Sequence, residues 1–389
     1  MSVYKRIGIL LSVLFVTLVF TTFFAGIDIK QRILVLGVAL DKDEYGYKMY
    51  TEVVVPTENT GESNSGGMRR ILSGRGKTVS EAFQSLNKYN GHLFSLGQCN
   101  LLAICGNLMK NHNVSDCLAY FAYSDAFKDG VTVVGTELSC EDFFFAEMPT
   151  ETFVTFAVHS AVTGNGKRIN VPVMDLLEFV KANATLSACS YVPVISFIRE
   201  IQPDTSDSAR QSMQKCISSD KMAVFVKGEF KEMLDADEMK SFNLVNGKDY
   251  YHVFVVDDSI ISSTLPRKIA VGNINKSVNT EYSLKNGRPL IKIRLDMQIK
   301  RLRTDTDGLS LPFMPVGERE ITPDISRQVQ NECTHRIEEI YSRLIDLDCD
   351  ILKIYSGFYK SLGAEWTAYT SFHPDWLQNT SVTAICNIS

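Results

Sequence analysis

The chain has 389 residues, 45% of them hydrophobic, and its 40 Lys and Arg against 45 Asp and Glu give a formal net charge of -5. A chain of this length exceeds the size at which a single core keeps growing, which predicts two or three domains. The negative balance argues against a nucleic-acid-binding surface, and the apolar content argues against a largely disordered chain.

The first distinctive segment is an uncharged run over residues 7–26, IGILLSVLFVTLVFTTFFAG. A helix of about 20 apolar residues is long enough to cross a bilayer. Lys5 and Arg6 precede the run, and Asp28 is the first charge after it. This asymmetry predicts a cytoplasmic N-terminus, with the folded body on the extracytoplasmic side of the membrane.

We therefore expect residues 1–26 to be a membrane anchor or an uncleaved signal. A cleaved secretory signal is the alternative, but its apolar region is usually about 7–15 residues long and ends at a small-residue site. Phe23 and Phe24 interrupt that small-residue pattern here. The length and the two aromatic residues favour the anchor.

The region after the run alternates strand and helix patterns. Residues 32–41 are almost continuously apolar, and residues 48–55 follow a turn, which predicts a β-hairpin. Thr78 and Glu81 have the spacing of a capping box at the start of a helix. Further patterns predict strands at 100–104, 131–134 and 189–198, and helices at 114–127 and 172–182. We predict an N-terminal α+β region over residues 27–205, with room for two subdomains.

The polar stretch QPDTSDSARQSMQ predicts a linker, which we place at residues 206–220. A C-terminal α+β domain is then expected over residues 221–389. Asn286 and Gly287 predict a tight hairpin turn between two long strands. The remaining patterns predict strands at 221–227, 230–234, 250–256, 267–274, 289–301 and 381–388, and helices at 235–244 and 322–347. The predicted class is α+β, a membrane helix followed by a multidomain mixed α/β body with mainly antiparallel sheets and a long helix near the C-terminus.

The sequence contains no recognisable catalytic, cofactor-binding or metal-binding constellation. His335 lies on the expected long helix beside several Glu residues, which is typical of a solvated face. Gly76, Lys77 and Thr78 resemble the end of a phosphate-binding loop, but Ile71 stands where its first glycine should be. Asp235 and its acidic neighbours fit the start of a helix, where the dipole favours negative charge. We predict a protein that is not an enzyme.

The nine cysteines have no C-x-x-C spacing, and most lie within apolar runs. This pattern favours small buried hydrophobic residues over a disulfide framework, a zinc site or a thioredoxin-like site. The aromatic segment containing Trp366 and Trp376 has two interpretations. It is either a surface platform for a ligand or, as is more common, an aromatic core packed under the long helix.

Four segments, in order, carry a resemblance to a known family. They are ILVLGVALDKD at 33–43, GRGKTVSEAFQSLNKYN at 74–90, MAVFVKGEFKEML at 222–234, and the region from Asp350 through Trp366 to Trp376. Together they resemble the Ger(x)C family of bacterial spore germination proteins, the C subunits of nutrient germinant receptors.

The resemblance implies a non-enzymatic subunit at the inner spore membrane, acting with polytopic A-type and B-type subunits. It transfers no binding residues. Members of the family usually carry a lipidated Cys at the end of the leader, but Ile27 occupies that position here, so no lipidation is predicted. We expect the apolar helix to replace the lipid anchor. The alternative function is an exported solute-binding protein or enzyme with a pocket near Trp366 and Trp376.

Overall fold

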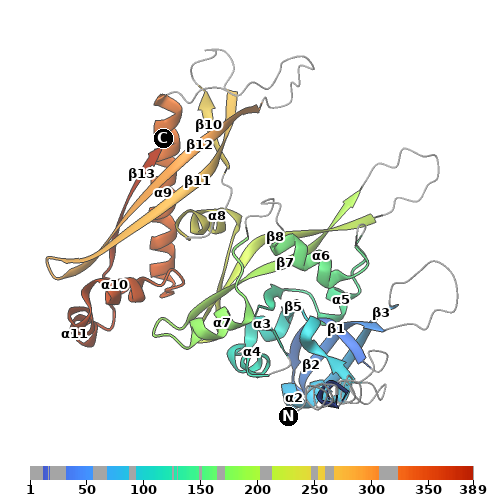
Figure 1. Ribbon diagram of the computed structural model, residues 1–389. Coiled ribbons are helices and arrows are strands. Elements are labelled where there is room, and N and C mark those ends of the chain that lie inside the picture. The colour runs from blue at the N-terminus through green and yellow to red at the C-terminus, as the bar shows by residue number, and fades with distance from the viewer. Residues whose placement is uncertain are drawn as a thin grey trace, which may run out of the picture.

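The computed structural model describes residues 12–15, 17, 32–55, 68–86, 93–124, 127–128, 130–148, 151–163, 171–201, 213–246, 253–258, 267–305 and 323–388. These residues form two β-sheets with their helices (Figure 1). The mixed α+β class is confirmed. The two sheets differ in size, in strand direction and in how many of their faces are covered.

The first sheet is mixed and has nine strands among the described residues. Their order is β3 (Met68–Gly76), β2 (Gly46–Val55), β1 (Arg32–Asp43), β5 (Leu101–Cys105), β6 (Thr132–Thr136), β7 (Cys189–Ile201), β8 (Met213–Val226) and β9 (Glu229–Leu234), with β4 (Leu93–Ser95) beside β1. The strands β1, β5, β6 and β7 pair in parallel. The expectation of mainly antiparallel sheets is therefore wrong for the centre of this sheet, because each connection between these parallel strands is long and contains at least one helix.

Helices cover both faces of the first sheet. They are α2 (Val79–Leu86), α3 (Gly106–Asn111), α4 (Ser115–Ala122), α5 (Cys140–Phe144), α6 (Val154–Thr163) and α7 (Leu176–Asn183), with a short 3₁₀ turn at Leu96–Gln98. Successive residues of a strand point to opposite faces, so Leu102 and Ile104 join one core, and Leu101 and Ala103 join the other. Both faces of the central strands are thus buried.

The first sheet also includes residues that we expected elsewhere. Residues 213–220, expected in the linker, form the first half of β8. Residues 221–234, expected in the C-terminal domain, lie in β8 and β9 and complete the same sheet. The polar composition of the stretch suggested a linker, but β7 supplies the antiparallel partner that satisfies its backbone groups.

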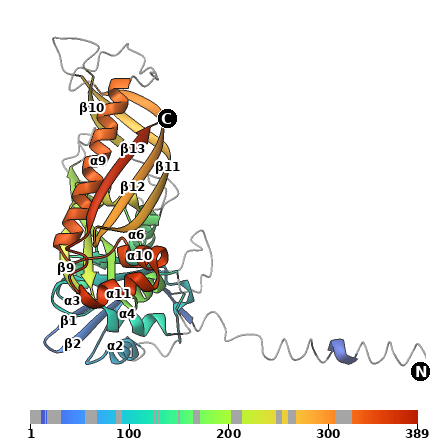
Figure 2. The ribbon, with the colours of Figure 1, turned by 90° about the vertical axis from the view of Figure 1, so that its left-hand side faces the viewer.

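The second sheet has four strands, in the order β10 (Val253–Asp258), β11 (Arg267–Lys285), β12 (Arg288–Asp305) and β13 (Ser381–Ile388). The helix α9 (Pro323–Asp346), the long helix that we predicted, covers one face and runs along β13 (Figure 2). The Asn286-Gly287 turn has positive φ at both residues, 53° and 75°, as a tight hairpin turn requires. Near the hairpin end lie α10 (Ile354–Leu362) and α11 (Ala364–Phe372). Between the two sheets lies α8 (Ala236–Val245).

Most of the predicted membrane segment, residues 7–26, lies outside the described residues. Residues 12–15 and 17 within it are helical, and Val13, Leu14 and Phe15 are each more than half exposed. Among the residues that the structure describes, no helix combines the length and the apolar character needed to cross a membrane. Ile27 also lies outside the described residues.

Candidate functional site at the junction of the two sheets

The acidic cluster of the sequence forms the start of α8, the helix at the junction of the two sheets. The Asp235 side chain accepts hydrogen bonds from the backbone N–H groups of Asp237 and Glu238, each at 2.9 Å. The Glu238 carboxylate accepts one from the Asp235 N–H at 2.9 Å, which completes a capping box. The acidic residues are therefore explained by the helix start, as we expected.

Cations from the second sheet and its helix hold α8 at both ends. At the first turn, the Arg343 Nε of α9 lies 2.9 Å from Glu238 Oε1. At the last turn, the Lys276 ammonium of β11 donates to the carbonyls of Asn243, Leu244 and Asn246, at 3.3 Å to Leu244 and 2.9 Å to Asn246. A positive charge at the C-terminus of a helix interacts favourably with the helix dipole. These contacts position α8, and with it β8 and β9, against the second sheet.

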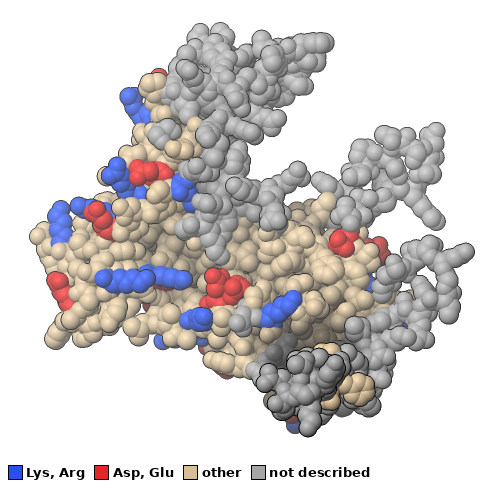
Figure 3. Space-filling model, in the orientation of Figure 1, with Lys and Arg blue, Asp and Glu red and all other residues tan. Residues whose placement is uncertain are grey.

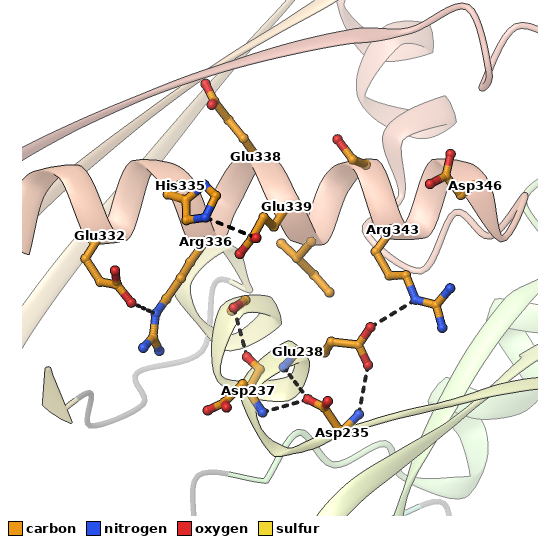
Figure 4. Close-up of a pocket in the computed structure, with 13 residues that line it drawn as sticks. Asp235, Asp237, Glu238, Glu332, His335, Arg336, Glu338, Glu339, Arg343 and Asp346 are labelled. Atoms are coloured by element: carbon orange, nitrogen blue, oxygen red, sulfur yellow. Dashed lines mark hydrogen bonds and ion pairs between the residues drawn. The ribbon is translucent and has the colours of Figure 1, made fainter. Parts of the chain in front are cut away.

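A cleft of about 740 Å³ lies between α8 and α9 (Figure 4). Two arginines, His335 and seven carboxylates line it: Asp235, Asp237, Glu238, Glu332, Glu338, Glu339 and Asp346. Arg336 pairs with Glu332 at 2.6 Å, and His335 Nε2 lies 3.1 Å from Glu339 Oε1. His335 is 67% exposed, so it belongs to a solvated helix face. Within the described part of the chain, no three His, Cys, Asp or Glu side chains are placed to hold a metal ion.

A second cleft, of about 450 Å³, lies between α7, the start of β7, the end of α8 and the turn after α9. Its most buried acidic group is Asp350, which is 4% exposed. The Asp350 carboxylate accepts hydrogen bonds from Ser187 Oγ at 2.5 Å and from the N–H groups of Ile354 and Tyr355 at 2.5 and 2.9 Å. Burial raises the pKa of Asp350, and these hydrogen bonds act in the opposite direction. Asp350 thus joins the first sheet to the start of α10.

The segment that resembled a phosphate-binding loop is a strand packed closely against a helix. A side chain at Gly74 would lie 2.3 Å from the Ala82 carbonyl, and one at Gly76 would lie 2.4 Å from the Ala82 N–H nitrogen. The two glycines are therefore required by the approach of α2 to β3. Thr78 accepts the Glu81 N–H at 3.2 Å, as the predicted helix start requires, although Glu81 bonds back to the N–H of Lys77. The side of these glycines that faces α2 is therefore filled by the helix.

The aromatic segment near the C-terminus is a core and not a surface platform. Trp366 is fully buried, and its ring stacks on Phe358 at 4.3 Å and on Tyr369 at 5.5 Å between ring centres. Trp376 and Tyr355 pack edge-on against it at 5.3 and 5.9 Å. The alternative of a ligand pocket near Trp366 and Trp376 thus gains no support, because the Trp366 ring is not accessible to a ligand.

Sequence reasoning missed the most buried charge of the first sheet, Glu52 on β2. Its carboxylate accepts the backbone N–H groups of Val154 and Thr155 at 3.0 and 2.8 Å and pairs with Arg69 Nε at 2.6 Å. The carboxylate therefore occupies the N-terminus of α6, where the helix dipole favours a negative charge. The available signal was a lone acidic residue inside an apolar strand, KMYTEVVV.

Asp41 has a similar positioning role at the end of β1. Its Oδ1 accepts the N–H of Leu108 in α3 at 2.9 Å. Asp43, two residues on, accepts the N–H of Tyr45 at 2.9 Å and pairs with Lys48 at 2.8 Å. Asp43 thus holds the hairpin tip in place, and Asp41 holds the start of α3 against the end of β1.

Charges of both signs are mixed on one face of the molecule. On the face shown in Figure 3, Lys and Arg are interleaved with Asp and Glu, and much of the surface between them is uncharged. The described residues on this face therefore form no basic stripe of the kind that binds a nucleic acid. The described residues thus form a body of two sheets that meet at α8.

Comparisons with known proteins place this two-part α+β body among the spore germination proteins. Residues 26–197 match the profile of the spore germination protein N-terminal domain. Residues 220–389 match the profile of the spore germination B3/GerAC-like C-terminal domain. The two matches leave only residues 1–25 and 198–219 uncovered. The chain belongs to the GerAC-like family of spore germination proteins, which confirms the resemblance found in its sequence.

A solved structure with a similar fold supports the same assignment. The crystal structure of the GerBC protein is similar to the chain with a TM-score of 0.51 and 12% sequence identity, over 90% of this chain and 96% of that one. At this identity the likeness concerns the fold. No curated protein sequence matches the chain significantly.

Proposed function

We propose that the chain is a non-enzymatic, membrane-anchored subunit of a spore nutrient germinant receptor and acts in spore germination. The observation that carries this proposal is the ordered match of both family domains, at 26–197 and 220–389. The likeness to the GerBC fold over almost the whole of both chains is consistent with it.

In this proposal the body lies on the extracytoplasmic side of the inner spore membrane, held by residues 7–26. The length and charge asymmetry of that run support the orientation. The exposed apolar side chains of Val13, Leu14 and Phe15 favour contact with lipid or with other apolar helices. The partners would be the polytopic A-type and B-type receptor subunits.

The test is a pull-down of the tagged full-length protein from detergent-solubilised spores, with partners and N-terminal peptides identified by mass spectrometry. We expect polytopic A-like and B-like subunits, together with a peptide that precedes Ile27. Absence of membrane partners, with a processed N-terminus, would overturn the proposal in favour of a released extracytoplasmic binding protein.

A matched pair of variants separates anchoring from general surface effects. Leu14→Arg places a charge within the apolar run, at a cost of about 2.5–3.5 kcal/mol at the centre of a membrane helix. Tyr45→Arg makes the same kind of change at a residue 72% exposed on the hairpin tip of the body. We expect Leu14→Arg to reduce the membrane-bound fraction after carbonate washing and Tyr45→Arg to leave it unchanged. Equal retention of both variants would contradict anchoring by this run.

A further inference from the structure

Six of the nine cysteines lie in three thiol–thiol contacts, although all nine are free thiols in the structure. The hydrogen-bonded pairs are Cys105 with Cys140, Cys189 with Cys349, and Cys333 with Cys386. In the first pair both residues belong to the first sheet and its helices, and in the third pair α9 meets β13 of the second sheet. The middle pair alone among the three joins the two sheets, because Cys189 begins β7 and Cys349 follows α9.

The backbone on both sides of this pair is fixed by hydrogen bonds. Cys189 Sγ accepts the N–H of Asp350 at 3.3 Å, and the Cys189 thiol donates to the Ser187 carbonyl oxygen at 2.9 Å. The Ser187 hydroxyl donates to the Asp350 carboxylate at 2.5 Å. Ser187 and Cys189 thus both bond to Asp350, the residue that follows Cys349. These bonds keep Cys349 beside Cys189.

Cys189 is the more accessible of the two thiols, since it is 6% exposed and Cys349 is fully buried. The hydrogen bond from the Cys349 thiol lowers the pKa of Cys189, with help from the Asp350 N–H, while burial and the carboxylates of Asp348 and Asp350 act against it. Hydrogen bonding to Cys189 and burial raise the pKa of Cys349. Cys189, although only 6% exposed, lines the 450 Å³ cleft, which gives an oxidant a route to it.

We propose that Cys189 and Cys349 form a disulfide bond that covalently joins the first sheet to the second. The Cys189 thiolate attacks one sulfur of a low-molecular-weight disulfide, forms a mixed disulfide and releases one thiolate. The Cys349 sulfur, after losing its proton to the released thiolate, attacks Cys189 Sγ and expels the second thiolate. Two protein thiols are oxidised, one external disulfide is reduced to two thiols, and the protons end on those thiols.

The bond would close a long loop across the junction, between residues 189 and 349. Cross-links between residues so far apart restrict the unfolded chain strongly, and they hold the joined elements together in the folded protein. The disulfide would add a covalent link to the ion pairs of Arg343 and the hydrogen bonds of Lys276 around α8. The proposed extracytoplasmic location determines only which oxidant is available to the protein, and the exchange reaction itself does not depend on that location.

The test uses the purified full-length protein in detergent, first reduced, then freed of reductant and exposed to oxidised glutathione. Remaining thiols are alkylated after denaturation, and the protein is digested without reductant. We expect a cross-linked peptide containing Cys189 and Cys349, lighter than the two separate peptides by two hydrogen atoms. We also expect alkylation of Cys189 and Cys349 to fall together, while the buried Cys99 and Cys117 remain alkylated. Dithiothreitol should restore both thiols.

Two variants control the assignment. Cys189→Ser should abolish the cross-link and leave Cys349 alkylated, whereas Cys117→Ser, at another buried thiol, should keep the cross-link. A Cys189 that stays alkylated, or that accumulates as a glutathione adduct without the cross-link, would overturn the proposal. The wild-type peptide decides the question even where a variant fails to fold. Because the assay needs no partner and no membrane, a failed pull-down from spores would leave its result intact.

Discussion

The two sheets bury their strands in different ways. In the first sheet, helices cover both faces, and every residue of β5 and β6 is buried. In the second sheet, α9 covers one face, so β13 alternates buried Ala384 and Cys386 with Ile385, which is 63% exposed. A sheet covered on both faces has no solvent side on which to place a charge. We therefore expect substitutions to destabilise the two sheets in different ways. The first sheet should be most sensitive at its buried polar groups, and the second at the close packing on its covered face.

The largest effect is expected from Glu52→Ala in the first sheet. The change removes a fully buried carboxylate and leaves Arg69 and the N–H groups of Val154 and Thr155 without their acceptor. Breaking a buried ion pair in this way costs about 3–5 kcal/mol. We expect the free energy of unfolding, measured by urea denaturation, to fall by roughly that amount.

The control for this change is Glu229→Ala, at an exposed position on β9 of the same sheet. Surface substitutions usually change stability by less than about 0.5 kcal/mol. If the two variants lost similar stability, the burial of Glu52 would not be the source of its effect.

The next effect concerns close packing against the second sheet. A side chain at Gly357 in α10 would lie 2.1 Å from the ring of Tyr282 on β11. Gly357→Ala must therefore displace the ring, and overpacking of this kind costs about 1–3 kcal/mol. Gly130→Ala is the matched control, since no heavy atom lies within 4 Å of its added carbon. A thermal unfolding midpoint that falls only in Gly357→Ala would show that the contact with the Tyr282 ring causes the loss of stability. Equal midpoints in the two variants would contradict this explanation.

Parts of this arrangement could be predicted from neighbouring residues alone. The helix start at Asp235 and the Asn286-Gly287 turn depend on residues close together in the chain, and both were predicted from the sequence. The resemblance of the four segments also identified the family. The burial of Glu52 was missed because its partners in α6 lie about a hundred residues further along the chain.

The segment 213–220 shows that a distant partner can also overturn a prediction made from local composition. Its polar composition predicted a linker, yet β7 pairs with it, and a strand pairing is not encoded in the strand's own residues. Lys276 likewise gives no local sign that it caps α8 some thirty residues earlier. Local chemistry could therefore be predicted from the sequence, whereas contacts between distant elements, including the whole junction, required the structure.

A smaller effect is expected where the two sheets meet. Lys276→Met removes the ammonium that donates to three carbonyls at the end of α8. A cation at a helix C-terminus contributes about 0.3–1 kcal/mol. We expect faster hydrogen exchange of the last-turn amides of α8, with little change in the core of either sheet. Lys292→Met, at an exposed position on β12, is the control, and equal exchange in the two variants would contradict the capping role.

The smallest effect is expected in the pH dependence of stability, which should differ between substitutions of His159 on α6 and His335 on α9. His159 on α6 is half-buried beside Thr132, and burial lowers its pKa below the usual 6.5. The unfolded chain therefore binds more protons than the folded one just below pH 6.5, so stability falls as the pH falls through that window and is fully present above it. His159→Gln should flatten this dependence in urea denaturation measured across the window. His335→Gln, on the exposed face of α9, controls for the loss of a surface histidine. If the pH dependence of the free energy of unfolding were the same in His159→Gln as in the unmodified protein, burial under α6 would not disfavour the charged imidazole. The contrast between the two sheets would then be supported only by the effects of the Glu52 and Gly357 substitutions.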